Sequence, residues 1–138
     1  MTQDRASGAA ANKWGRETAR KIASKIDAVM KGRTSNEARL DGKTIVIKCA
    51  ASRTDSVGVT FKMLDRLDSI IGAFQLDDGS FEVWSLSPEK FRQGMRDTRS
   101  KGSAAGKVGI VRKVSFEKGG ITLGRIRLDD DSTSAGAD

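Results

Sequence analysis

Histidine and tyrosine are absent from this chain of 138 residues, which also has only one cysteine and one proline. Without histidine, histidine-based triads and histidine metal sites are excluded, so any catalysis would depend on carboxylates, lysines and a bound hard cation. The single cysteine, Cys49, excludes an internal disulfide and is typical of a reducing compartment. No apolar run approaches about 18 residues and no basic-then-apolar leader is found, so we expect a cytoplasmic protein without membrane association.

Acidic residues are scarce relative to basic ones. Lysine and arginine number 25 against 18 acids, a net charge of +7, and four of those acids lie in the last ten residues, which leaves +11 for the remainder. Such an excess favours polyanions as partners, by direct attraction and by release of their counterions, although extra lysines also serve solubility. We therefore expect a nucleic-acid partner, with DNA favoured over RNA.

The length fits one domain with one hydrophobic core. Residues 1–11 and 129–138 are rich in small and polar residues and lack hydrophobic periodicity, so both are expected to be disordered tails. The second of them is acidic. Residues 12–128 are expected to form the single folded domain.

Periodicity and turn signals predict the order of elements. An amphipathic helix is expected first, and the dipeptide Asp41-Gly42 predicts a tight hairpin. Ser87-Pro88-Glu89 combines a capping hydroxyl, a proline and an acid at a helix start. The expected class is α+β, a central mixed or antiparallel sheet with an N-terminal helix and a second helix after the central hairpins. The predicted segments are helices at Lys13–Met30 and from Pro88 to near Asp97, a helical turn at Lys62–Asp68, and strands at Glu37–Leu40, Thr44–Ala50, Val57–Phe61, Ser69–Gln75, Phe81–Leu86, Val108–Phe116 and Ile121–Leu128.

Lys48 is the most unusual residue of the predicted strands. It follows Ile45, Val46 and Ile47 in a run that suits a strand covered on both faces. A lysine there costs free energy unless its amine reaches a partner or the edge of the sheet. Two interpretations follow: the side chain extends to solvent at the strand end, or its amine is directed at a phosphate.

The segment from Lys13 to Asp97 resembles the PD-(D/E)XK, or restriction-endonuclease-like, nuclease superfamily. The resemblance rests on Glu37, Asp41-Gly42 and the strand Thr44–Ala50, followed less specifically by Phe81–Leu86 and Ser87-Pro88. It implies a nuclease-like fold in which two acids hold one or two divalent cations, Mg²⁺ or Mn²⁺, that activate a hydroxide for phosphodiester cleavage. It also implies that Glu37 is the first acid and Lys48 the lysine of the site.

The second acid of that family's motif should stand two residues before the lysine, where this chain has Val46. A displaced acid could come from Asp41, Asp55 or Asp65, and Asp55 is the nearest downstream; Glu17 of the first helix is a further candidate. With Asp55, the expected catalytic set is Glu37, Lys48 and Asp55, and the metal ligands are Glu37 and Asp55. Without a displaced second acid, we expect the protein to keep the nuclease-like fold but not to cleave nucleic acid.

Basic residues concentrate in two segments. Between Lys90 and Lys113 eight cations accompany one acid, Asp97, and a second group lies on the polar side of the first helix. Such groups grip phosphate oxygens without reading bases. The expected nucleic-acid contacts are Arg92, Arg96, Arg99, Lys101, Lys107, Arg16, Arg20 and Arg53.

Three hypotheses therefore stand side by side: a metal-dependent phosphodiesterase, a non-catalytic accessory protein that grips the nucleic-acid backbone, and an interaction protein that binds an acidic protein partner. A two-fold homodimer stays open, because dimers are common among nucleases of this size although no exposed apolar stripe requires one.

Overall fold

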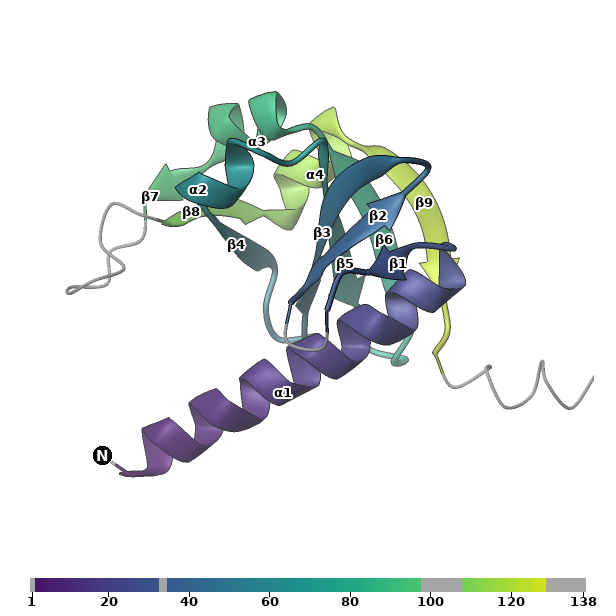
Figure 1. Ribbon diagram of the computed structural model, residues 1–138. Helices are drawn as coiled ribbons and strands as arrows, with labels where there is room; N and C mark the ends of the chain where they lie inside the picture. Colours follow the sequence, from purple (N-terminus) through teal and green to yellow (C-terminus); the bar gives the residue numbers. More distant parts are fainter. Residues whose placement is uncertain (1, 33–34, 98–107, 129–138) are drawn as a thin grey trace, which may run out of the picture.

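A six-stranded mixed sheet forms the centre of the computed structural model, which describes residues 2–32, 35–97 and 108–128, with the backbone alone at 2–12 and 97 (Figure 1). The described residues form four helices and nine strands: α1 (Thr2–Lys25), β1 (Val29–Met30), β2 (Glu37–Leu40), β3 (Lys43–Ala50), β4 (Ser56–Thr60), α2 (Phe61–Leu64), β5 (Ser69–Gln75), β6 (Phe81–Leu86), α3 (Pro88–Gly94), β7 (Arg96–Asp97), β8 (Val108–Arg112), α4 (Lys113–Gly119) and β9 (Ile121–Ile126). The predicted α+β class is confirmed.

The large sheet has the strand order β1-β2-β3-β5-β6-β9, in which only β3 and β5 run parallel. The β2–β3 hairpin turns at Asp41 and Gly42, whose φ angles of 52° and 79° are the two positive values that a tight hairpin turn of this kind requires. Strands β4, β8 and β7 form a second, smaller sheet in that order, which among the described strands is not hydrogen-bonded to the first. The parallel pair requires a crossover, and β4 and α2 supply it.

Two hydrophobic layers cover the two faces of the large sheet. On one face α1 packs through Ala19, Ile22 and Ala23, all at most 1% exposed, against residues that include Ile45 and Ile47. On the other face the small sheet and helices α2, α3 and α4 bury a second cluster, which includes Phe74, Phe91 and Phe116 (Figure 1). The centre of β3 is covered on both faces, as its apolar sequence predicts.

Helix α1 differs from the predicted helix at both ends. It begins at Thr2, so the segment 1–11, expected to be a tail, is helical from residue 2; alanine-rich sequence has high helix propensity. It ends at Lys25, because Asp27 has a φ angle of 64° and β1 follows at Val29–Met30. The N-terminal part of α1 projects beyond the sheet (Figure 1). The acidic segment 129–138 lies outside the described residues.

The two predicted closing strands, Val108–Phe116 and Ile121–Leu128, are wrong in part. The expected strand Val108–Phe116 ends at Arg112 and continues as helix α4, and β8 pairs with β4 and β7 rather than with β9. The reason is a long-range fit. An ideal Cβ at Gly72 would lie 2.9 Å from Cε2 of Phe116, so the ring of Phe116 occupies the space that a side chain at Gly72 would need. The second predicted helix is also shorter than expected and ends at Gly94 before β7.

Candidate functional site

Lys48 lies near the end of β3, just beyond the part of that strand that is paired with β2. The β2–β3 register ends with Glu37 opposite Val46, and alternation places Val46, Lys48 and Ala50 on the face away from α1. On its other side Lys48 is paired with Gly72 of β5. Lys48 therefore occupies an interior strand at a position where one flank of that strand is open.

A groove of about 250 Å³ runs along this open flank of β3. Residues from α1, from the position just before β2, and from β3 and β4 form it. Its lining residues are Gly15, Asn36, Lys48, Cys49, Ser56, Val57 and Gly58. The half-buried lysine thus faces a space that can hold a small polar group.

The Lys48 ammonium has no counter-charge in this groove. Within the part of the chain that the structure describes, no carboxylate forms an ion pair with it. Burial lowers the pKa of Lys48, an effect that the neighbouring Cys49 opposes only in part, and burial raises the pKa of Cys49 to about 12. The Cys49 thiol is therefore neutral near pH 7. An anion bound in the groove would offset the free-energy cost that burial imposes on the charged form of Lys48.

The groove also carries an acceptor without a donor. The Oδ1 atom of Asn36 is buried and has no hydrogen-bond partner among the described residues. An unsatisfied buried polar group costs free energy until a ligand or water supplies the missing bond. Ser56 adds a hydroxyl that can donate to an anion. The groove therefore combines a positive charge and a hydroxyl donor with one buried acceptor, Asn36 Oδ1, that has no partner among the described residues.

Gly15 offers a way to fill the groove without disturbing the fold. An ideal Cβ at Gly15 meets nothing within 4 Å, and glycine inside a helix costs about 1 kcal/mol relative to alanine. We expect Gly15→Ala and Gly15→Leu both to raise the melting temperature by roughly 3 °C. Only leucine should lower the affinity for a phosphate-bearing ligand, by about tenfold, which thermal melting and equilibrium binding together measure. Equal affinity of the two variants would show that the groove is not the contact site.

Glu37 lies close to the expected acid site but is engaged by cations. It stands directly opposite Val46, on the same face of the sheet as Lys48. Arg66, which follows α2, donates Nε–H to Oε1 at 3.4 Å and also donates an Nη2–H to Oε2. The amine of Lys31 lies 4.0 Å from Oε1. Sequence reasoning missed Arg66, and no local signal could have found it, because the pair joins residues 29 positions apart.

The other acids considered do not join Lys48. Asp55 pairs with Arg112 at 3.1 Å, and Asp65 pairs with Arg92 at 2.5 Å. Asp41 lies in the β2–β3 turn at the opposite end of β3, and Glu17 is exposed on α1. In the described ranges, no three His, Cys, Asp or Glu side chains are grouped so as to hold a metal ion.

The residues present therefore do not fit a divalent cation at this point. Both oxygens of Glu37 accept from one guanidinium, and the neighbouring Val46 is fully buried and apolar. Mg²⁺ requires several oxygen ligands, which one engaged carboxylate does not provide.

The predicted basic contacts divide into those near the groove and those away from it. Arg16 follows Gly15 on α1, and exposed Arg53 lies in the loop after β3, so both stand close in sequence to groove residues. Arg20 is one turn further along α1. Arg92 and Arg96 are exposed on α3 and β7, and Arg92 is already paired with Asp65. Three predicted contacts lie outside the described residues: Arg99, Lys101 and Lys107.

No protein-family model matches this chain, and no curated protein matches it in sequence. Among the described helices, none has both the length and the apolar character that crossing a membrane requires.

Proposed function

We propose that this protein binds the sugar–phosphate backbone of nucleic acid, with DNA favoured over RNA, and that it does so without cleaving it. The observation that carries the proposal is the Lys48 ammonium, which faces an open groove and has no counter-charge among the described residues. A phosphate diester supplies the missing negative charge and two free oxygens. Lys48 and Ser56 would then hold one phosphate.

Flanking charge extends this contact along a strand. Arg16 and exposed Arg53 are close in sequence to the groove residues Gly15 and Ser56, and the chain as a whole carries +7. Neutralising successive phosphates releases condensed counterions, which supplies most of the free energy of non-specific binding. Contacts of this kind position a duplex and carry no base information. We therefore expect binding with little sequence preference.

The Glu37–Arg66 pair supports binding without hydrolysis. A carboxylate that is neutralised by a guanidinium neither recruits a cation nor activates water as a free base would. The pairing with Arg66 also neutralises the negative charge of Glu37, which would otherwise repel a phosphate at Lys48. Arg66 thus makes the surface beside Lys48 more favourable for an anion.

A phosphodiesterase is the alternative, and one observation favours it: Glu37 and Lys48, the acid and the lysine that the resemblance implies for the site, share a face of the sheet. Arg66→Met separates the two proposals, because it removes the guanidinium that bonds both oxygens of Glu37 and leaves only the Lys31 amine, 4.0 Å from Oε1.

The test measures binding and cleavage on the same labelled duplex. By fluorescence anisotropy at about 50 mM salt we expect a dissociation constant of about 10⁻⁶ M or lower. On gels with Mg²⁺ or Mn²⁺ we expect no cleavage by the natural protein or by Arg66→Met. Cleavage that Glu37→Gln and Lys48→Met both abolish would establish the phosphodiesterase instead. Absence of binding at low salt would overturn the proposal and favour an acidic protein partner.

A further inference from the structure

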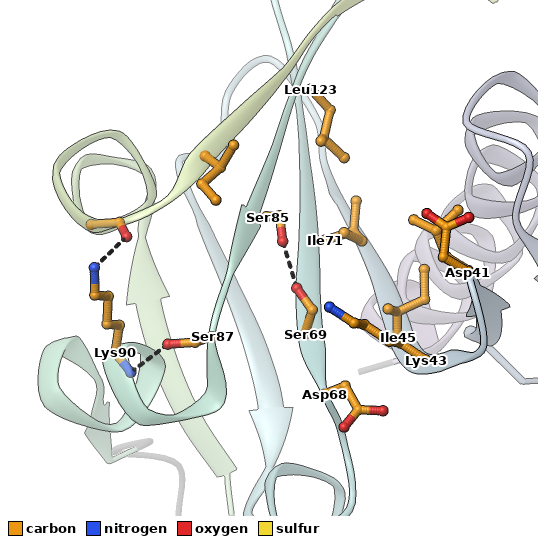
Figure 2. A pocket seen from close by; sticks show the side chains of 13 residues that line it. Asp41, Lys43, Ile45, Asp68, Ser69, Ile71, Ser85, Ser87, Lys90 and Leu123 are labelled. Atoms are coloured by element: carbon orange, nitrogen blue, oxygen red, sulfur yellow. Dashed lines mark hydrogen bonds between the residues drawn. The ribbon is translucent and has the colours of Figure 1, made fainter.

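A second and larger cavity lies at the opposite end of β3 from Lys48, on the face of the sheet that α1 covers only in part. Its volume is about 400 Å³, within the range of about 300–1,000 Å³ that small-molecule sites occupy. Among its described lining residues none comes from α1. Figure 2 shows the cavity with strands β3, β5, β6 and β9 around it.

The floor and one wall of this cavity are apolar. Ile45 of β3 and Ile71 of β5 form the floor, and each is 1% exposed. Ile121 and Leu123 of the edge strand β9 form the wall, and they are 71% and 39% exposed. Large aliphatic side chains left in water beside a concave floor mark a surface that gains free energy when an apolar body covers it.

A pair of hydroxyl groups lies at the centre of the cavity. Ser69 Oγ and Ser85 Oγ are 2.5 Å apart, and Ser69 Oγ is 3.5 Å from the carbonyl oxygen of Leu86 (Figure 2). The two hydroxyls have two protons, of which their mutual bond uses one. Because a bond of 3.5 Å to Leu86 is long, the second proton can be donated to a ligand.

Lys43 is a cationic residue that lines the cavity together with this pair. In Figure 2 its side chain passes Ile45 and its amine points toward Ser69. No carboxylate among the described residues forms an ion pair with it. Across the cavity, the Lys90 amine donates to the carbonyl oxygen of Gly119 at 3.1 Å.

Two acids also line the rim, and both are placed away from the centre. Asp68 Oδ2 accepts from the backbone N–H of Thr44 at 2.8 Å, which holds that carboxylate beside the start of β3. Asp41 belongs to the β2–β3 turn, on the far side of Ile45 from the hydroxyl pair (Figure 2). The groups that face the centre are therefore donors: one ammonium and one hydroxyl.

We infer that this cavity binds a small amphipathic organic anion, with its apolar body against Ile45, Ile71, Ile121 and Leu123 and its anionic head between Lys43 and the Ser69–Ser85 pair. The size, the apolar floor and the convergent donors suit a carboxylate or sulfonate on an aliphatic or aromatic body. The site is separate from the Lys48 groove and does not depend on the proposed nucleic-acid binding.

The experiment uses 8-anilinonaphthalene-1-sulfonate, whose fluorescence rises in apolar surroundings, titrated into the full chain. We expect Lys43→Gln and the double change Ile121→Ser with Leu123→Ser each to weaken its binding by about tenfold. Matched changes at exposed residues elsewhere, Val29→Ser, Val114→Ser and Lys118→Gln, should leave binding unchanged. Octanoate should displace the dye, and octylamine should not.

Three results would overturn the inference. Equal loss in the matched variants would show that the dye binds exposed apolar side chains without a site. Displacement by octylamine as well as octanoate would remove the role of Lys43. If light scattering showed that the protein is a dimer and that the Ile121→Ser and Leu123→Ser variant is a monomer, this face would be the contact with a second copy of the chain instead.

Discussion

Replacement of Lys48 by methionine should weaken binding to a short DNA duplex by about tenfold or more and at the same time raise the melting temperature. The loss of affinity follows from removal of a charge-assisted hydrogen bond to phosphate, worth about 1.5–3 kcal/mol. The gain in stability follows because a half-buried ammonium, without an ion-pair partner among the described residues, costs free energy, and methionine has a similar apolar stem. A gain of about 1 kcal/mol would correspond to roughly 3 °C.

The pH dependence of the free energy of unfolding tests the same substitution in a second way. Because burial lowers the pKa of Lys48 in the folded chain from the ordinary value of 10.5, the unfolded chain binds more protons between those two pKa values. The stability contribution of Lys48 therefore rises with pH across that interval, and Lys48→Met should lack this rise. Denaturant unfolding at several pH values measures it.

Lys118→Met is the matched control, because Lys118 is exposed in the last turn of α4 and does not line the groove. It should leave the melting temperature unchanged and lower the affinity at most slightly. If Lys48→Met destabilised the protein and left the affinity intact, Lys48 would be a structural residue and the proposed contact would be wrong.

The largest expected loss of stability comes from Phe116→Ala, about 3–5 kcal/mol. Phe116 is fully buried, and its ring meets Phe74 edge-on at 5.3 Å between centroids. It also fills the space above Gly72. Alanine would leave a cavity that the rigid sheet below cannot close. Since domains of this size are stable by about 5–15 kcal/mol, the change removes a large share of the total.

Urea unfolding followed by circular dichroism measures this effect. Phe116→Leu, which keeps most of the buried volume, should cost clearly less than Phe116→Ala. A cost below about 1 kcal/mol for alanine would mean that α4 is not anchored on the sheet as described. The anchoring matters for the site, because the backbone N–H of Lys113 at the start of α4 donates to the Asp55 carbonyl at 2.6 Å, next to the loop that carries Arg53.

Local signals in the sequence predicted the elements that local chemistry determines. The Asp41-Gly42 turn, the apolar β3 covered on both faces and the Ser87-Pro88 helix start all reappear in the structure. These features depend on residues a few positions apart, which is the range over which propensity and turn chemistry act.

Features determined by distant residues were not predictable. Residues 113–119 form α4 rather than a strand because Phe116 fits over Gly72, 44 positions earlier in the chain. Arg66 reaches Glu37 only because β4 and α2 carry the chain across to β5. Asp55 meets Arg112 at a separation of 57 residues, which removes it from the expected metal site. In each case a tertiary contact decided the outcome, and the sequence carries no local mark of it.

The central claim is that Lys48 contacts a nucleic-acid phosphate, and salt dependence tests it most directly. The logarithm of the affinity for duplex DNA falls with the logarithm of the salt concentration by a slope of about 0.9 per neutralised phosphate. We predict that the slope for Lys48→Met is smaller than that of the natural protein by about 0.9, while Lys118→Met keeps the natural slope. Identical slopes for the natural protein and Lys48→Met would contradict the claim.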